Sequence, residues 1–458
     1  MPLQVLKEQL EAILESGDDK QLNEFVDHQN ISDVADLIYE LPDFDSRILG
    51  AMSVHRAASV FKILDLNSQK NIIKTLPPNN TAGLLNELPP DDRTDFLEEL
   101  PSNAVRELIK LLDNEERKIT LSLLGYPENS VGRLMTPDYV YVYESNTVQQ
   151  VLETVRRVGK NSETIDVIYV INVKGELLDD IRIREFILAD PDKRVKELMD
   201  DRVIALNAYQ DQEEAAEVFK MNNRVAMAVV SNSNKLLGIV TIDDILWVAT
   251  EEFSEDVQKI GGTEALEQPY LEIPLHKLFK KRVVWLIVLF IGELMTISAM
   301  HQFEDEIARV VVLATFIPLI ISSGGNSGSQ AATLIIQAMA LREITVGDWW
   351  RIMRREIISG LLLGMTLCIL GVSVIAIWHS VSETFGDYYL SIGLTIGLSL
   401  IGVVLWGTLM GSMLPLLLKK LGADPAASST PFVATLVDVT GLIIYFSVAY
   451  LILSGKLL

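Results

Sequence analysis

The sequence predicts a multidomain membrane protein with an all-α superhelical N-terminal domain, a duplicated α/β domain and an α-helical transmembrane domain of five spans. Two observations lead to this prediction. Residues 1–275 carry 51 acidic and 27 basic residues, whereas residues 276–458 carry 11 and 12, so the net charge of −23 resides in the first half. The second half holds five apolar stretches long enough to cross a bilayer, which takes ~20 residues. We therefore expect an acidic soluble half followed by a membrane-embedded half.

Residues 1–128 are predicted to form short helices. Leu-Pro pairs recur every twelve residues, at Leu76-Pro77, Leu88-Pro89 and Leu100-Pro101. Proline suits the first turn of a helix and disrupts its interior, so each pair ends one helix and starts the next. This repetition predicts a small helical superhelix. Asp91, Asp92 and Asp95 fall early in one of these helices, where helix capping and metal bridging are both open interpretations.

Residues 129–248 contain one α/β unit twice, about sixty residues apart. Each copy has a strand, a helix and a second strand; in order these are Tyr139–Tyr143, Val148–Val158, Val167–Ile171, Val203–Leu206, Gln212–Met221 and Ala226–Val230. The openings and endings of the copies, Leu134-Met-Thr-Pro137 and Leu237-Gly-Ile-Val-Thr-Ile-Asp-Asp244, resemble those of tandem CBS domains. That resemblance implies a module that senses a ligand, often an adenine nucleotide, and controls an attached domain.

Residues 249–275 are predicted to connect the soluble and membrane parts. Glu251, Glu252, Glu255 and Asp256 cluster on one stretch of a predicted helix, where neighbours three or four apart share a face. Like charges so placed repel one another unless a cation lies between them. The cluster is therefore either a solvated face or a cation-responsive element.

The five predicted spans are Val283–Met300, Val310–Leu341, Ile357–Trp378, Tyr389–Leu418 and Pro431–Leu453. A polar, glycine-rich run, Ser322–Gln330, is expected to break the second span, and irregular backbone at that depth survives only inside protein or along a water-filled cavity. Asp438 lies in the fifth span, where a charge costs at least about 2.5–3.5 kcal/mol and by default marks an ion path. Close helix packing by Gly325 and Gly328, and a helix–helix hydrogen bond from Asp438, are the structural alternatives.

Basic residues predict the orientation of the spans. They precede the first span, separate the second from the third, and follow the fourth: Lys277, Lys280, Lys281, Arg282, Arg342, Arg351, Arg354, Arg355, Lys419 and Lys420. This bias predicts a multi-pass protein of the cell membrane with a cytoplasmic N-terminus and, after five spans, an external C-terminus. The first residues also lack the long apolar region of a signal peptide.

Several functions are disfavoured by composition and motif. Strong acidity argues against nucleic acid as a partner, because phosphate binding needs basic surface. The single cysteine, Cys368, rules out a disulfide within one chain. No phosphate-binding loop, metalloprotease motif or serine nucleophile elbow is evident, so we do not expect an enzyme.

The whole chain resembles the MgtE-type magnesium channels, most specifically in Pro318–Thr333 and in Asp424–Gly441. The resemblance implies a homodimer in membrane lipid with Mg²⁺ as its ligand and a pore on the two-fold axis; Mn²⁺ and Co²⁺ stay open as further ions. It assigns pore positions to Asp438, Ala434, Asn326, Gly325 and Gly328. It assigns regulatory metal positions to Asp211, Glu213, Asp244, Glu252, Glu255, Asp256 and Asp424, with Asp91 and Asp95 as candidates. The sequence departs from the family pattern at Asn223, Arg224 and Trp247, which leaves adenine-nucleotide binding open.

The chemistry of magnesium agrees with this interpretation. Mg²⁺ sheds its water reluctantly and meets protein through one or two carboxylates, which two copies of Asp438 would supply. We therefore predict a homodimeric Mg²⁺ channel that admits the ion and closes when cytosolic Mg²⁺ binds the acidic residues. The alternative is a cation-coupled secondary transporter of divalent metals, for which a broken helix and a midplane carboxylate are equally natural. A receptor with a membrane anchor is a third hypothesis, but an anchor needs neither feature.

Overall fold

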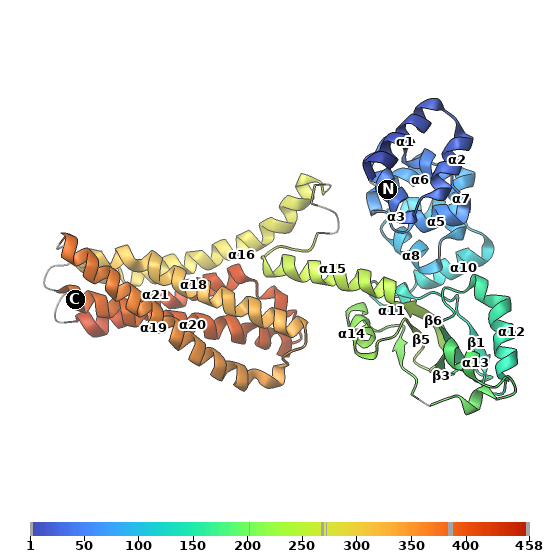
Figure 1. Ribbon diagram of the computed structural model, residues 1–458. Helices are drawn as coiled ribbons and strands as arrows, with labels where there is room; N and C mark the ends of the chain where they lie inside the picture. Colours follow the sequence, from blue (N-terminus) through green and yellow to red (C-terminus); the bar gives the residue numbers. More distant parts are fainter. Residues whose placement is uncertain (1–2, 201, 267–269, 272, 383–387, 455–458) are drawn as a thin grey trace. The chain divides into compact units, whose positions relative to one another are not determined.

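The computed structural model describes residues 3–200, 202–266, 270–271, 273–382 and 388–454. The chain divides into two compact units, Met1–Thr250 and Glu251–Leu458 (Figure 1). The first unit contains the N-terminal helices and the α/β repeats, and the second contains the membrane helices. The predicted fold class, a helical domain, a CBS-like pair and five apolar helices, is confirmed.

The N-terminal part is a stack of short helices. Their bounds are α1 Leu3–Ser16, α2 Asp19–His28, α3 Ile31–Glu40, α4 Asp45–Gly50, α5 Val54–Phe61, α6 Leu66–Thr75, α7 Pro78–Glu87, α8 Pro90–Glu98, α9 Ser102–Ile109 and α10 Asn114–Leu123, with a 3₁₀ turn at Pro42–Phe44. Alternate helices touch, as α1 with α3, α3 with α5, and α5 with α7. Leu88 caps the end of α7 and packs in the shared core, while Pro90 opens α8, which confirms that Leu-Pro pairs punctuate these helices.

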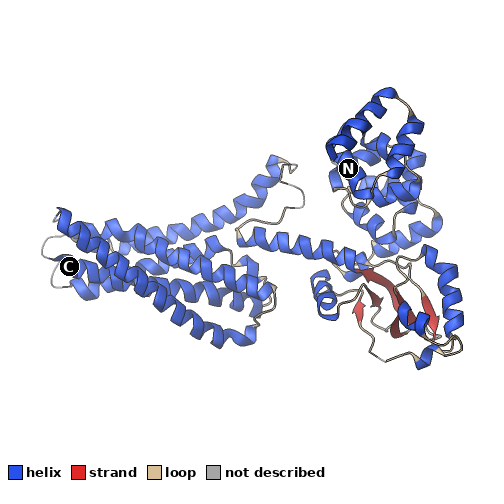
Figure 2. Cartoon of the chain, in the orientation of Figure 1, coloured by secondary structure: helices blue, strands red, loops and turns tan. Residues whose placement is uncertain are grey.

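The middle part folds as two equivalent three-stranded sheets, red in Figure 2. The first repeat comprises α11 Val131–Leu134, β1 Tyr141–Tyr143, α12 Val148–Val158, β2 Val167–Ile171, β3 Leu177–Arg182 and α13 Ile183–Leu188. The second repeat comprises β4 Ala205–Asn207, α14 Gln212–Asn222, β5 Ala226–Val230 and β6 Leu236–Thr241. Two 3₁₀ turns lie at Gly159–Asn161 and Val195–Glu197. In each sheet the first two strands are parallel and the last two antiparallel, with an irregularity near the end of the central strand. The internal duplication predicted from the sequence is therefore present in the fold.

A shared core joins the two repeats. Alternate residues of the central strands, among them Tyr169 and Ala228, pack together between the sheets. The repeats also exchange backbone bonds, since Leu177 N donates to Asn234 O at 3.0 Å and Leu236 N donates to Gly175 O at 3.0 Å. The two repeats therefore pack as one domain and not as two separate ones.

The connector is helical. Helix α15 runs from Ile242 to Ile260 without a break and so begins inside the Thr-Ile-Asp-Asp motif that ends the second repeat. Residues 267–269 and 272 of the predicted connector lie outside the described residues. One helix therefore carries both the last repeat motif and the acidic cluster.

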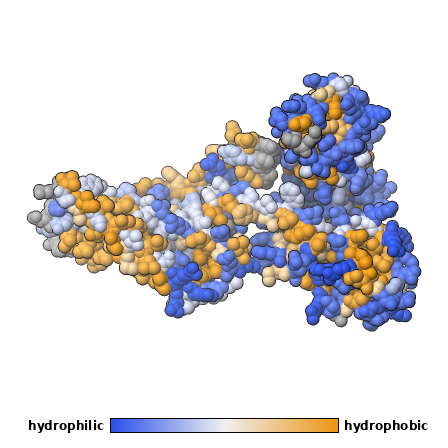
Figure 3. Space-filling model, in the orientation of Figure 1, coloured by the Kyte–Doolittle hydropathy of each residue, from blue (hydrophilic) through white to orange (hydrophobic). Residues whose placement is uncertain are grey.

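The second unit is a bundle of long helices. They are α16 Leu275–Gln302, α17 Glu304–Arg309, α18 Val311–Ala340, α19 Trp349–Ser382, α20 Tyr389–Lys420 and α21 Thr430–Leu453, with 3₁₀ turns at Val346–Asp348 and Pro425–Ala427. Five of these helices are long and apolar enough to cross a membrane, as predicted. Apolar residues cover much of the visible face of these helices in Figure 3, which suits contact with lipid. The loop at 383–387, part of the predicted external side, lies outside the described residues.

The predicted break in the second span is wrong: α18 continues through the glycine-rich run as one helix. Its glycines permit close contact with α20. A methyl group at Gly407 would lie 2.4 Å from Gly324 O, and one at Gly411 would lie 2.1 Å from Gly328 O. Small residues let two helix backbones approach, while the helix keeps its own hydrogen bonds satisfied in the membrane. The polar run therefore builds a helix–helix contact instead of an interruption.

We predict that Gly411→Val destabilises the membrane unit. The new side chain would collide with the backbone of α18, and overpacking of this kind costs about 1–3 kcal/mol or more. Loss of helix on heating, followed by circular dichroism in detergent, should shift to lower temperature. Gly393→Ala is the matched control on the same helix, because the nearest atoms to its new methyl group lie 3.9 Å away. Equal melting of both variants would show that the α18–α20 contact is not tight.

Candidate functional site

The intramembrane carboxylate lies where α21 meets α18. A methyl group at Gly325 would lie 3.5 Å from Asp438 Oδ1 and 3.5 Å from Ala434 Cβ, so these three predicted pore residues are neighbours. Asp438 is half-buried in the single chain. Asn326 is exposed on α18, and its amide donates to Ser322 Oγ at 3.4 Å. The contact between α18 and α21 thus includes the Asp438 carboxylate and Gly325, and the exposed amide of Asn326 follows Gly325 in the sequence.

Gly328 has different surroundings from the other predicted pore residues. It is buried, and a methyl group there would lie 3.0 Å from Gly407 O and 3.1 Å from Val433 Cγ1. Its position fits the packing alternative, in which glycine allows α18, α20 and α21 to approach. Gly325 is buried as well, but its nearest neighbours include the Asp438 carboxylate.

Two hydrogen bonds hold α21 in place on the C-terminal side of this contact. Tyr445 Oη donates to Leu313 O on α18 at 2.9 Å, and Trp406 Nε1 on α20 donates to Thr440 Oγ1 at 2.8 Å. Bonds made inside an apolar bundle fix rotation of a helix as well as its depth. The bundle therefore positions the Asp438 carboxylate on a rigid element.

A first acidic cluster lies in the N-terminal unit, between α8 and the start of α15. Its carboxylates are Asp91, Asp92, Glu163, Asp243 and Asp244. Asp91 is only 7% exposed, and its Oδ1 atom has no hydrogen-bond partner among the described residues. Burial, and then the negative charge of Asp244, raise the pKa of Asp91 well above its usual range. A buried carboxylate without a partner favours either protonation or a bound cation.

Burial and repulsion from neighbouring carboxylates also affect the other members of this cluster. Burial, followed by repulsion from Asp243, raises the pKa of Asp244 to about 7, although Thr241 donates a hydrogen bond to it at 2.8 Å. Lys62 supplies an ammonium, with Nζ 3.3 Å from Asp92 Oδ2 and 4.0 Å from Asp243 Oδ2. One ammonium cannot neutralise five carboxylates, so the cluster retains a net attraction for cations.

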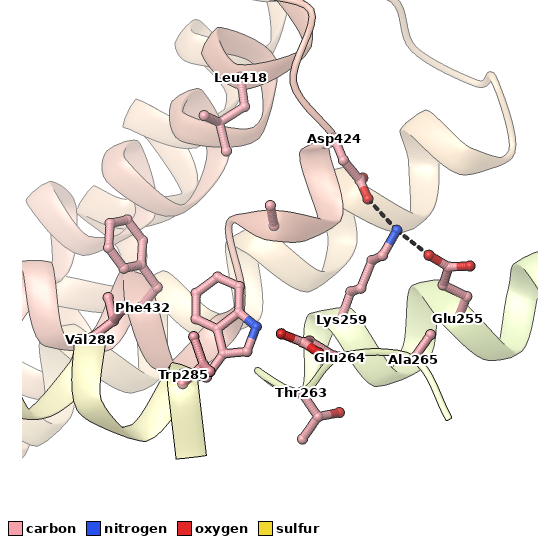
Figure 4. A pocket seen from close by; sticks show the side chains of 12 residues that line it. Glu255, Lys259, Thr263, Glu264, Ala265, Trp285, Val288, Leu418, Asp424 and Phe432 are labelled. Carbon is pink, nitrogen blue, oxygen red and sulfur yellow. Dashed lines mark hydrogen bonds and ion pairs between the residues drawn. The ribbon is translucent and has the colours of Figure 1, made fainter. Parts of the chain in front are cut away.

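A second acidic cluster lies in the membrane unit, where the end of α15 meets the Pro425–Ala427 turn. Lys259 Nζ lies 2.7 Å from Asp424 Oδ2 and also pairs with Glu255 (Figure 4). Asp424 caps the turn by accepting from Ala426 N at 2.8 Å. The three groups border a pocket of about 710 Å³ whose other walls include Trp285 and Phe432.

The remaining predicted regulatory residues are placed separately. Asp211 caps α14 by accepting from Glu213 N at 2.8 Å, which gives the Asp211 side chain a structural role. Asp95 is exposed on α8, and Glu252 and Asp256 lie on α15. Within the described ranges, no three carboxylate, histidine or cysteine side chains converge closely enough to hold a metal alone.

Two of the three departures from the family pattern, Asn223 and Arg224, have local structural explanations. Asn223 ends α14 with φ +50°, a left-handed conformation that asparagine tolerates well. Arg224 pairs with Asp180 of the first repeat at 2.7 Å, and both side chains are largely buried. Trp247 is 67% exposed on α15. Arg224 thus links the two repeats.

Sequence reasoning missed Lys62, Glu163, Asp243 and Lys259 as members of the acidic clusters. Asp243 adjoins the predicted Asp244 in the sequence, and this adjacency could have indicated that Asp243 belongs to the cluster. The two lysines gave none, because a lone lysine in an acidic stretch usually lies in solvent. Their partners come from other elements that only the fold brings near.

The fold defines a class: a multi-pass membrane protein with a CBS-type module. Family models agree, since residues 317–448 match the divalent cation transporter domain MgtE, residues 29–129 match the MgtE intracellular N domain, and residues 131–191 and 195–251 match CBS domains. The chain belongs to the MgtE family of magnesium transporters.

Named relatives support this assignment. The chain is 40% identical to the magnesium transporter MgtE of Thermus thermophilus over 76% of both chains, and 32% identical to that of Bacillus subtilis over 74% of this chain and 73% of the relative. It is similar to the crystallised cytosolic domain of the Mg²⁺ channel MgtE in complex with ATP, at 36% identity and a TM-score of 0.51, covering 53% of this chain and 99% of that one. These relatives are named as transporters or channels rather than as enzymes.

Proposed function

We propose that the chain forms a homodimeric Mg²⁺ channel that admits Mg²⁺ and closes when cytosolic Mg²⁺ binds its acidic residues. The observation that carries the proposal is Asp438, a half-buried carboxylate inside a span, in contact with Gly325 and Ala434. An intramembrane carboxylate is costly unless an ion or a partner compensates it. The relatives named as magnesium transporters support the choice of ion.

A second copy would complete the pore. Asp438 is half-buried and Asn326 is exposed in the single chain, so both are available to a facing subunit. Two carboxylates on an axis, with nearby carbonyl and amide oxygens, would hold a largely hydrated Mg²⁺. Mn²⁺ accepts similar oxygen ligands, so it is a natural competitor to test, together with Co²⁺.

Membrane potential supplies the driving force. The basic residues of the loops favour a cytoplasmic N-terminus and an external C-terminus. A potential of 100 mV, negative inside, is worth about 2.3 kcal/mol per charge and acts twice on a divalent cation. Entry of Mg²⁺ therefore needs no nucleotide hydrolysis.

Closure rests on the acidic clusters. Mg²⁺ bound near Asp91 and Asp244 would join α8 to the start of α15, because these carboxylates come from both elements. Mg²⁺ bound near Glu255 and Asp424 would strengthen the contact between the end of α15 and the membrane helices, where Lys259 pairs with both carboxylates. When the ion is scarce, buried carboxylates such as Asp91 lack compensation, and the elements they join separate. Asp211, Glu213, Asp95, Glu252 and Asp256 are secondary candidates for the same role.

Adenine nucleotide is a second ligand to consider, because one solved relative holds ATP. In this chain the guanidinium of Arg224 is engaged by Asp180 at 2.7 Å between the repeats. An adenine ring would have to displace this ion pair to stack there. We infer weaker nucleotide binding than in that relative.

Single-channel recording separates the channel from a coupled carrier. The continuous α18 lacks one of the two features on which the carrier alternative rested, the broken helix, whereas the second, the carboxylate of Asp438, is present. Unitary currents carried by Mg²⁺ through purified protein in planar bilayers support a channel. Uptake that is strictly coupled to a second ion and never produces unitary currents would contradict it.

We predict that deletion of residues 1–130 weakens closure by Mg²⁺ and leaves conduction intact. The deletion removes Asp91 and Asp92 of the first cluster, whereas the Asp438 contact is built wholly within the second unit. Mg²⁺ uptake by the truncated chain should continue at cytosolic concentrations that close the parent. Its folding is checked by elution as a single dimeric species. Loss of all transport in such a well-folded truncation would contradict this division of roles.

A further inference from the structure

The second acidic cluster already contains a cation of the chain's own. Lys259 lies in the last turn of α15, and its Nζ atom is 2.7 Å from Asp424 Oδ2 and also paired with Glu255. Its two partners come from α15 itself and from the turn that precedes α21. The ammonium thus sits between carboxylates that a metal ion would otherwise bridge.

The end of α15 is docked by uncharged contacts as well. Thr430 Oγ1 donates to Ile260 O at 3.2 Å, and Gly262, with φ +75°, turns the chain close to Pro431. A methyl group at Gly262 would lie 3.3 Å from Pro431 Cγ. The methylene stem of Lys259 borders the same pocket as Trp285 and Phe432, which suits an amphipathic side chain. The ion pairs therefore close a contact that packing has already shaped.

We propose that Lys259 is a tethered counter-cation that docks the connector helix on the membrane unit when magnesium is scarce, and that Mg²⁺ acts here by displacing it. The proposal rests on the proposed function, in which Mg²⁺ bridges Glu255 and Asp424. Lysine suits this role because its ammonium is a compact, hydrated charge on a flexible stem, so it can leave without disturbing the backbone.

Two consequences follow for regulation. First, Mg²⁺ binding at this cluster is an exchange of one cation for another, so the ion gains less than it would from two uncompensated carboxylates. Second, the connector end stays docked at low Mg²⁺, which places the larger Mg²⁺-dependent movement elsewhere. The first cluster repeats the pattern, with Lys62 between Asp92 of α8 and Asp243 of α15 at 3.3 and 4.0 Å.

Hydrogen exchange of residues 250–266 in the full-length protein in nanodiscs, measured with and without millimolar Mg²⁺, tests the proposal. In the parent, we expect these amides to be protected without Mg²⁺ and to change little when it is added. In the Lys259→Met variant, the exchange rate of these amides without Mg²⁺ should rise about two- to fivefold, which is the effect expected from losing a partly exposed ion pair. Added Mg²⁺ should restore the parental protection.

Three further variants make the result specific. Lys259→Arg keeps the charge and should behave as the parent. Lys277→Met removes an exposed lysine at the start of α16 and should change nothing. Asp424→Asn keeps an oxygen to cap its turn but removes the bridging charge, so its lost protection should not be restored by Mg²⁺.

Unchanged protection of Lys259→Met without Mg²⁺ would overturn the proposal, and so would a loss that Mg²⁺ does not restore. Currents recorded from the same preparations test the proposed function separately. A parent channel that ignores Mg²⁺, combined with the expected exchange pattern, would reject Mg²⁺ gating and leave the docking role of Lys259 standing.

Discussion

Replacing Asp438 by alanine should abolish Mg²⁺ uptake while the protein still assembles. Asp438 is the carboxylate beside Gly325 and Ala434, and it would face the ion directly. Hydrogen bonds to a charged group are worth about 1.5–3 kcal/mol, so losing this carboxylate should lower uptake at least about tenfold. Uptake is measured in a host that depends on the introduced transporter for magnesium, and assembly is checked by size-exclusion chromatography in detergent.

Two comparisons make this result interpretable. Asp438→Asn keeps the shape and hydrogen bonding of the side chain and removes its charge, so a comparable loss shows that charge matters. Ser447→Ala on the same helix removes an exposed hydroxyl that bonds only to Ile443 O of its own helix, at 2.7 Å, and should transport normally. Normal uptake by Asp438→Ala would reject the pore assignment.

The double variant Glu255→Gln, Asp256→Asn should stay open at millimolar Mg²⁺ concentrations that close the parent. It removes two neighbouring negative charges from the last turns of α15, one of which reaches Lys259 and borders the pocket beside Asp424. Each lost carboxylate weakens the cross-link that Mg²⁺ can make there. We expect the closing concentration to rise about two- to fivefold or more, given the modest value of partly exposed charge pairs.

The readout is the Mg²⁺ concentration that halves the open probability. Asp190→Asn, Asp192→Asn is a matched control, because it also removes two carboxylates but from an exposed loop of the first repeat. Protection of residues 1–266 from protease by Mg²⁺ should weaken in parallel in the connector variant alone. An unchanged closing concentration would mean that the connector carboxylates form only a solvated face.

Periodicity and punctuation predicted much of the fold. The α12 and β2 ranges match their predicted bounds, because Thr147 caps the helix and an unbroken apolar run forms the buried strand. The continuity of α18 was not predictable in the same way. A glycine-rich run looks like a break in one helix, and only the facing glycines of α20, Gly407 and Gly411, give it a packing partner.

The candidate site likewise contains residues that the sequence could predict and residues that it could not. Asp438 was evident from the sequence because a charge in an apolar span is rare. Lys259 and Asp424 lie 165 residues apart, and nothing local to either indicates their contact. Asp211 shows the opposite case, since its family position suggested a metal ligand while the fold uses it to cap α14. Contacts between distant elements decide which acidic residues share a cation.

The most direct test of Mg²⁺-gated conduction is an inside-out patch recording of the parent protein while cytosolic Mg²⁺ is stepped from zero to millimolar levels. The account predicts unitary Mg²⁺ currents whose open probability falls reversibly as cytosolic Mg²⁺ rises, with unitary conductance unchanged. Currents whose open probability is independent of cytosolic Mg²⁺ would contradict it.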